Sequence, residues 1–395
     1  MRFMKTTRYL AALAMLAVAA VGAENEETPM YALDRDGQRA TPKVVIEDVA
    51  AWPNLTRLPN GDIVALIYNQ PSHGRMPGDV ECWASEDEGE TWTLRSVAAP
   101  RGTPEQNRMN VAAGLTAEGD LILVTSGWSA PGNPEAWSNI GEVLPAWVCV
   151  SKDSGETWSI DKESFPKAPD GRHLIPFGDI MPGVDGKLLV AAYRGAADEE
   201  AQEAVKDADP LVRRAAAGQN WVIRGDGQTW EAPVPVTRVP RHNETALLHL
   251  GEGVWLAAAR RGGLLLSRSE DDARTWSEWG PGTRGRVTPN GLHPGHLMRL
   301  DDGTVVLSCG NRSRPTGARG VDVMFSDDEG KTWSEPYRVL DTGMGDIGYP
   351  SSVLRKDGQI VTAYYANGIA GYSGYHMGVV VWDPTTTRKQ SETGQ

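Results

Sequence analysis

The chain has 395 residues, with 44 Gly, 26 Pro and 14 Trp against only 4 Phe. This composition is typical of many short strands joined by tight turns. The formal net charge is -13, which argues against a nucleic-acid-binding protein because such a surface needs a basic face. A local arginine cluster can still bind a small anion within an acidic protein.

The first residues have the features of a targeting segment. Arg2, Lys5 and Arg8 precede an apolar run at 9–21, which the small residues Gly22 and Ala23 follow. This pattern predicts a signal peptide over residues 1–23 and a secreted or periplasmic protein. The apolar run is too short to cross a membrane comfortably and no later stretch is longer, so we expect no membrane span.

A short motif of the form S-x-D-x-G-x-T-W recurs along the chain. Its Asp can accept hydrogen bonds from the backbone of its own turn, its Gly can supply a positive φ, and its Trp begins the next strand. We therefore expect these aspartates to stabilise turns and not to catalyse a reaction. The copies are 85–92, 151–158, 326–333, a fourth at 269–276 with Ala273 in place of the glycine, and a shortened fifth at 226–230.

A second repeat lies between the copies of this motif, which we call Asp boxes. Each copy is an apolar strand, a turn containing glycine and another apolar strand. The turn glycines are Gly61, Gly119, Gly186, Gly253, Gly303 and Gly358. Six hairpins and five boxes predict an all-β fold, a six-bladed β-propeller of four-stranded antiparallel blades in one domain over residues 24–384. We expect the ring to close by pairing of 43–48 with the last strand.

Two segments depart from the repeat. Residues 195–220 are rich in Ala and Glu, and predict a helical insertion in the third blade, broken near Pro210. The insertion could overhang a site or decorate a loop. The polar tail at 385–395 is expected to be disordered.

The boxes, their spacing and the hairpins make residues 45–383 resemble the sialidase superfamily. The resemblance implies hydrolysis of terminal sialic acids with retention of configuration. It also implies three arginines around the sugar carboxylate, a tyrosine nucleophile paired with a glutamate, and an aspartate as acid and base. A neutral tyrosine approaches an anomeric carbon that bears a carboxylate with less repulsion than a second carboxylate would.

The resemblance transfers these roles to particular residues. Glu244 matches the glutamate, Arg260 the second arginine and Tyr349 the nucleophile. Arg319 matches the third arginine, with Arg312 as the alternative. Asp79, before the first box, takes the place of the acid/base, and Asp346 stands three residues before Tyr349.

Two departures from the family pattern concern the carboxylate site. Ala51 stands where the family has its first arginine, and 363–366 reads Ala-Tyr-Tyr-Ala where a glutamate should hold that arginine. The two absences fit each other, since a glutamate without its arginine would be a buried unpaired charge. His293 and His296, together with His73 and His242, are candidates for lining the altered site. The spacing of His, Cys and carboxylates matches no metal site, so we expect neither metal nor cofactor.

Three functions fit this sequence. The first is a secreted sialidase-like exo-glycosidase acting on sialic acid or a related acidic sugar of a glycan. The second is a non-catalytic carbohydrate-binding propeller. The third is a glycosidase or lyase for polysaccharide containing uronic acid, with Tyr and His as base and acid. The sequence does not indicate an oligomeric state.

Overall fold

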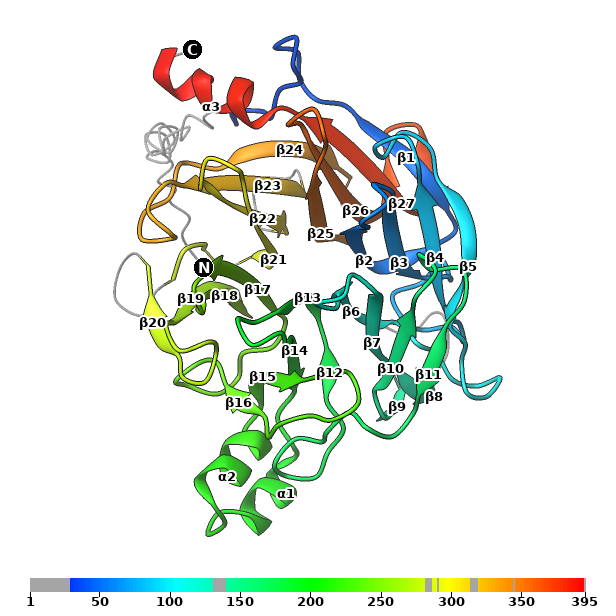
Figure 1. Ribbon diagram of the computed structural model, residues 1–395, viewed down its shortest axis with the longest axis vertical. Helices are drawn as coiled ribbons and strands as arrows, with labels where there is room; N and C mark the ends of the chain where they lie inside the picture. The colour runs from blue at the N-terminus through cyan, green and yellow to red at the C-terminus, as the bar shows by residue number, and fades with distance from the viewer. Residues whose placement is uncertain are drawn as a thin grey trace, which may run out of the picture.

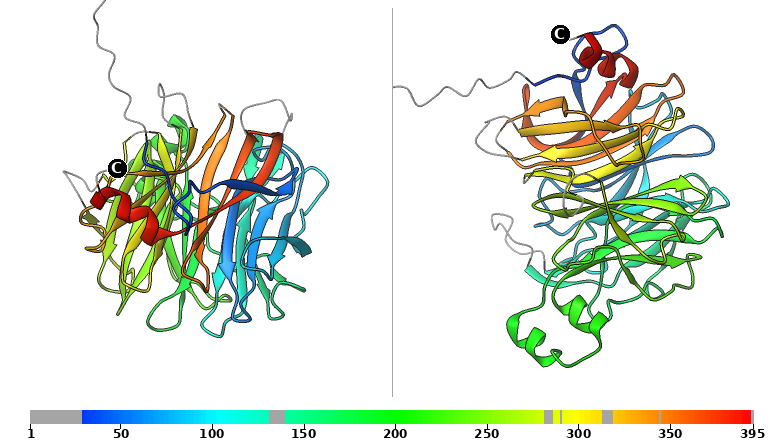
Figure 2. Two further views of the ribbon diagram at one scale, coloured as in Figure 1. Left: turned by 90° about the horizontal axis from the view of Figure 1, so that it is seen from above. Right: turned by 90° about the vertical axis from the view of Figure 1, so that its left-hand side faces the viewer.

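A computed structural model of the chain describes residues 29–130, 140–280, 286–289, 291–312, 319–343 and 345–393. The expected signal peptide at 1–23 lies outside these ranges. Figure 1 shows β-sheets arranged around a common centre, and Figure 2 shows the same sheets from two other sides. The fold is an all-β propeller. None of the described helices has both the length and the apolar character required to cross a bilayer.

Four sheets of the ring are separate and have four strands each. Within each of them, neighbouring strands pair in antiparallel fashion, as the hairpin repeat predicts. In strand order they are β2 (Ala50–Arg57), β3 (Ile63–Tyr68), β4 (Val80–Ser85) and β5 (Thr93–Ala99); β17 (Thr245–Gly251), β18 (Val254–Arg261), β19 (Gly263–Ser269) and β20 (Ser277–Trp279); β21 (Leu292–Arg299), β22 (Val305–Asn311), β23 (Arg319–Ser326) and β24 (Tyr337–Thr342); and β25 (Ile347–Leu354), β26 (Ile360–Ile369), β27 (Tyr372–Trp382) and β1 (Pro42–Glu47).

The remaining blade strands form one nine-stranded sheet, so the prediction of six separate four-stranded blades is wrong. One antiparallel run is β6 (Asn110–Leu115), β7 (Leu121–Ser126), β10 (Trp147–Ser151) and β11 (Ser159–Asp161). The other is β13 (Gly178–Pro182), β14 (Leu188–Arg194), β15 (Gln219–Gly225) and β16 (Val234–Pro235), with β12 (Ile175–Pro176) beside β14. A separate two-stranded ribbon contains β8 (Trp128–Ala130) and β9 (Ile140–Val143).

A parallel pairing between β6 and β13 joins the two runs, with Ile180 opposite Gly114. A Cβ atom at position 114 would lie 1.9 Å from the carbonyl oxygen of Ile180. Glycine therefore allows these two inner strands to approach within hydrogen-bonding distance, and they merge where a larger residue would keep them apart.

The six predicted hairpins all form, and each turn glycine has a positive φ, between 76° and 98°. The first strand of each hairpin lies nearest the centre of the ring in Figure 1. These inner strands are β2, β6, β13, β17, β21 and β25, and each contacts its neighbours around the ring. Side chains at the start of these strands therefore meet around one axis.

The Asp boxes form the expected turns between the third and fourth strands. In the second box, Oδ1 of Asp153 accepts hydrogen bonds from the Ser151 hydroxyl (2.7 Å) and the Thr157 amide (2.9 Å). The Gly155 amide donates to Ser151 Oγ at 2.8 Å. Hydrogen bonds from Thr157 lower the pKa of Asp153 to about 2. Asp87, Asp271 and Asp328 make the same bonds, so their carboxylates are occupied within the turns.

The two ends of the described chain lie together. β1 pairs with β27, so Lys43 lies opposite Val379. The expected disordered tail is wrong for most of its length, because α3 occupies Pro384–Thr393. Thr387 is fully buried, and its hydroxyl accepts a hydrogen bond from the Leu33 amide at 3.0 Å. The N-terminal segment thus contacts α3, as both figures show.

Two helices lie within the segment 195–220. They are α1 (Glu199–Ala204) and α2 (Pro210–Ala216), capped at their N-termini by Asp198 and Asp209. They connect β14 to β15, and Figure 1 shows them at the outer edge of the molecule, far from the centre of the ring.

Candidate active site

Irregular backbone at the start of two neighbouring inner strands forms one wall of the site. Tyr349 in β25 has φ +52°, and the pairing register shifts between Gly348 and Ser351. Trp52 in β2 also has φ +52°. A bulge redirects the side chains that it carries, and the Trp52 and Tyr349 rings stack with centroids 4.9 Å apart.

Tyr349 and Glu244 are in direct contact. The Tyr349 hydroxyl donates a hydrogen bond of 2.6 Å to Glu244 Oε1. Arg260 Nη1 donates to Glu244 Oε2 and lies 3.3 Å from the Tyr349 hydroxyl. Tyr349 and Glu244 are almost fully buried, whereas the Arg260 side chain retains 23% of its exposure. The structure thus brings Tyr349 against Glu244, 105 positions earlier in the chain, and against Arg260, 89 positions earlier.

The charges around this group determine its protonation. Burial and the neighbouring Glu244 carboxylate raise the pKa of Tyr349 far above its ordinary value. Burial acts to raise the pKa of Glu244 too, but the Arg260 charge and the Tyr349 hydrogen bond outweigh it and lower this pKa. At neutral pH the pair is therefore a neutral phenol bonded to an ionised carboxylate that can accept its proton.

Arg312, and not Arg319, is the second arginine near this pair. The Arg312 guanidinium carbon lies 5.6 Å from the centre of the Tyr349 ring, and its Nη2 donates to the Tyr365 hydroxyl at 3.0 Å. Arg319 Nη1 instead donates to the carbonyl of Gly345 at 2.5 Å. Among the described residues, Arg319 contacts neither Tyr349 nor Glu244.

Asp79 occupies a different position from the one expected of an acid/base. Its Oδ1 accepts a hydrogen bond from the Arg101 amide at 2.7 Å and lies 3.1 Å from Arg101 Nε. Its own amide donates to Asn69 Oδ1 at 2.9 Å. In the part of the chain that the structure describes, these contacts fix Asp79 immediately before β4, with no hydrogen bond to Tyr349 or Glu244.

A cluster that the sequence did not identify as a unit lies beside Tyr349. Asp346 Oδ2 is 2.7 Å from His73 Nδ1, and Asp346 Oδ1 accepts a hydrogen bond of 3.0 Å from the Tyr365 hydroxyl. Asp346 Oδ1 is also 3.4 Å from Arg312 Nη2. Tyr365 belongs to the stretch where a glutamate was expected, so a neutral phenol takes the place of that charge.

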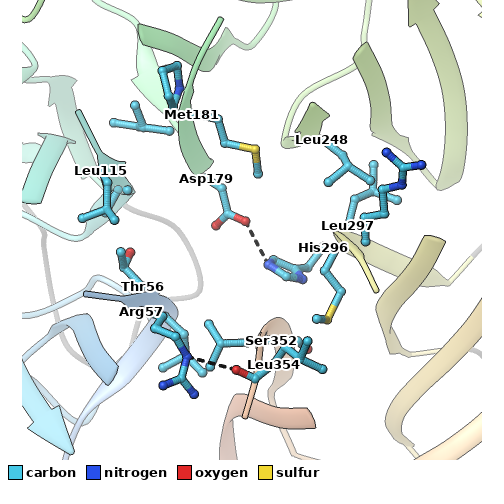
Figure 3. Close-up of a pocket in the computed structure, with 18 residues that line it drawn as sticks. Thr56, Arg57, Leu115, Asp179, Met181, Leu248, His296, Leu297, Ser352 and Leu354 are labelled. Carbon is cyan, nitrogen blue, oxygen red and sulfur yellow. Dashed lines mark hydrogen bonds and ion pairs between the residues drawn. The ribbon is translucent and has the colours of Figure 1, made fainter. Parts of the chain in front are cut away.

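Two of the other predicted histidines, His293 and His296, lie in β21. His296 Nε2 is 3.0 Å from Asp179 Oδ2, and both residues line a cavity of about 440 Å³ on the axis, shown in Figure 3. They also line a smaller cavity that reaches Tyr349, so they separate the large cavity from the site. His293 lies in β21, but its side chain lies outside the described part. Within that part, no group of three or more His, Cys, Asp or Glu could hold a metal ion.

The family model of the BNR repeat-like domain matches residues 74–362. The chain belongs to this family. The chain shares its propeller architecture with solved sialidases, so its fold is sialidase-like.

Solved structures with this fold have low sequence identity to this chain. A protein of unknown function from Dyadobacter fermentans DSM 18053 is 20% identical with a TM-score of 0.67, over 87% of this chain and 97% of that one. The NanB sialidase from Streptococcus pneumoniae is 12% identical with a TM-score of 0.61, over 87% and 70%. A Trypanosoma rangeli sialidase in complex with 2,3-difluorosialic acid, a covalent intermediate, is 14% identical with a TM-score of 0.60, over 92% and 58%.

Proposed function

We propose that this protein is an exported exo-glycosidase that removes terminal sialic acid or a related acidic sugar from glycans with retention of configuration. The observation that carries the proposal is the 2.6 Å hydrogen bond from the Tyr349 hydroxyl to Glu244. A phenol with a raised pKa is a poor nucleophile alone, and becomes a good one when a base in contact takes its proton during attack. Glu244 is such a base.

The first half of the reaction uses this pair directly. Tyr349 Oη attacks the anomeric carbon, its proton moves to Glu244, and the glycosidic C–O bond breaks. In the second half, water attacks the same carbon, and the departing tyrosinate regains the proton from Glu244. Two displacements at one carbon retain its configuration.

Arg260 and Arg312 are the proposed anion clamp. Among the described residues, the side-chain hydrogen bonds of Arg260 involve Nη1 alone, so Nε and Nη2 remain for a ligand. Arg312 Nη1 is likewise without such a contact in the described part. Two partly exposed guanidinium groups beside the nucleophile match a carboxylate. Because Ala51 replaces the first family arginine, we propose acidic sugars as a class and not sialic acid alone.

The test is turnover of acidic aryl glycosides by the Tyr349→Phe variant. We expect loss of nearly all turnover with an unchanged fold, since the ring and its stacking on Trp52 remain. Tyr364→Phe is the matched control: Tyr364 adjoins Tyr365 in β26, and its buried hydroxyl has no hydrogen-bond partner among the described residues.

Full activity of Tyr349→Phe would contradict the proposal. Glycan binding without turnover, unchanged in Tyr349→Phe, would favour the non-catalytic carbohydrate-binding alternative. An unsaturated product detected by ultraviolet absorbance would indicate a lyase.

A further inference from the structure

The proposed hydrolysis still needs a proton donor for the leaving group. The Asp79 carboxylate, expected in this role, is bound by Arg101, and His296 is buried below Tyr349 against Asp179. Any residue that protonates the glycosidic oxygen must lie beside the nucleophile and have a titratable atom accessible to the substrate.

His73 meets the first condition. It belongs to the loop between β3 and β4, and its ring centroid lies 6.3 Å from that of Tyr349 and 6.4 Å from that of Trp52. Both ring pairs meet edge to face. His73 therefore forms part of the same aromatic wall as the nucleophile.

Asp346 fixes the chemistry of this ring. Its carboxylate lies 2.7 Å from His73 Nδ1, which makes Nδ1 a proton donor to Asp346 and leaves Nε2 as the atom that can gain or lose a proton. In the described part of the chain no hydrogen bond reaches Nε2, and 25% of the side chain is exposed. His73 thus also meets the second condition.

The partners of Asp346 keep it ionised. Burial alone would raise its pKa, but the hydrogen bond and charge of His73 and the charge of Arg312 lower the pKa to about 2. Tyr365 adds a hydrogen bond to Oδ1 and also lies 3.0 Å from His73 Nδ1. A carboxylate that remains charged throughout the reaction can stabilise an imidazolium ion beside it.

We propose that His73 is the catalytic acid and base of this site and that Asp346 is its positioning residue. In the first half, the Nε2 proton of His73 moves to the glycosidic oxygen as the C–O bond breaks and Tyr349 bonds to the anomeric carbon. In the second half, neutral Nε2 takes a proton from the attacking water, which restores the imidazolium. This inference rests on the proposed hydrolysis and names the residue that completes it.

The leaving group provides the test. The 4-nitrophenolate ion is a good leaving group and departs without being protonated, whereas an alkoxide must be protonated as it departs. Loss of a general acid therefore slows cleavage of alkyl glycosides selectively. The probes are the 4-nitrophenyl and methyl glycosides of N-acetylneuraminic acid and of glucuronic acid. His73→Asn keeps a donor for Asp346 but has no titratable group.

We expect His73→Asn to lower kcat/KM for the methyl glycoside by about 100-fold or more, within the usual range for general acid catalysis. The loss on the 4-nitrophenyl glycoside should be below about tenfold. Asp346→Asn should show the same selectivity with a smaller loss. His249→Asn, a histidine of β17 stacked on Trp255, is the control and should show no selectivity.

An equal loss on both glycosides, or no loss, would overturn the role of His73 while the proposed hydrolysis stands. Selectivity in His73→Asn but not in Asp346→Asn would overturn the positioning role alone. A wild-type protein that cleaves none of these glycosides contradicts the proposed hydrolysis, and the inference about His73 with it.

Discussion

Arg260 neutralises the buried Glu244 carboxylate through a hydrogen bond from Nη1 to Oε2. Glu244 is 3% exposed, so water cannot take over the role of this arginine. The contact links the stability of the ring to the chemistry of its centre, because the same carboxylate accepts the hydrogen bond of Tyr349.

The first prediction concerns this charge pair. Arg260→Met should lower the free energy of unfolding by about 3–5 kcal/mol, because it leaves a buried carboxylate without its partner. Adding Glu244→Gln removes the charge and should recover much of the loss. Urea unfolding at pH 7 of the two single variants and the double variant checks this. If Arg260→Met has the same effect in the Glu244→Gln background, the charge is not the cause.

The second prediction concerns acid stability. The pKa of Asp346 is about 2 in the folded protein, below the ordinary 3.8. The ionised group therefore contributes stability above about pH 4, and this contribution is lost as the pH falls toward 2. The difference between the two pKa values of Asp346 corresponds to about 2 kcal/mol in the free energy of unfolding. Asp346→Asn should be less stable than the wild type by about this amount at pH 6 and equally stable near pH 2. Chemical unfolding between these pH values measures it, and a constant difference would contradict it.

The third prediction separates the Asp boxes from catalysis. Asp153→Ala removes the acceptor of the Ser151 and Thr157 hydrogen bonds and should lower the free energy of unfolding by about 1 kcal/mol, as loss of a capping residue does. Asp153→Asn keeps one oxygen and should lose less. Turnover per folded molecule should be the same in both variants. A loss of turnover per folded molecule would contradict this prediction and indicate that the Asp box contributes to catalysis.

The sequence predicted the hairpins because turn glycines and Asp boxes are local signals that act over a few residues. Gly114 is also a single residue visible in the sequence, but it acts on a strand that lies far away in the chain. Its consequence appears only when Ile180 of the next inner strand lies against it. The merging of two antiparallel runs into one sheet was therefore missed, although the hairpins themselves were predicted correctly.

In the site, too, the sequence predicted individual residues better than the contacts between them. The family resemblance identified Tyr349, Glu244 and Arg260, which the structure brings together. The resemblance favoured Arg319 over Arg312 as the third arginine. The position of an arginine in the sequence does not show whether its guanidinium faces Tyr349, and in the structure Arg312 does so. The His73–Asp346 contact joins residues 273 positions apart; each of them was named singly from the sequence, but no motif pairs them. A histidine next to a carboxylate in space has no signature in one sequence.

The pairing of β1 with β27 makes the order of strands around this molecule circular. The Gln390 side chain donates to the Tyr31 carbonyl at 2.8 Å, so the last turn of α3 contacts the N-terminal segment that precedes β1. A short linker between these ends, with new termini opened in any other exposed hairpin loop, would preserve every sheet hydrogen bond described above. Several circular permutants of this ring should therefore form the same sheets.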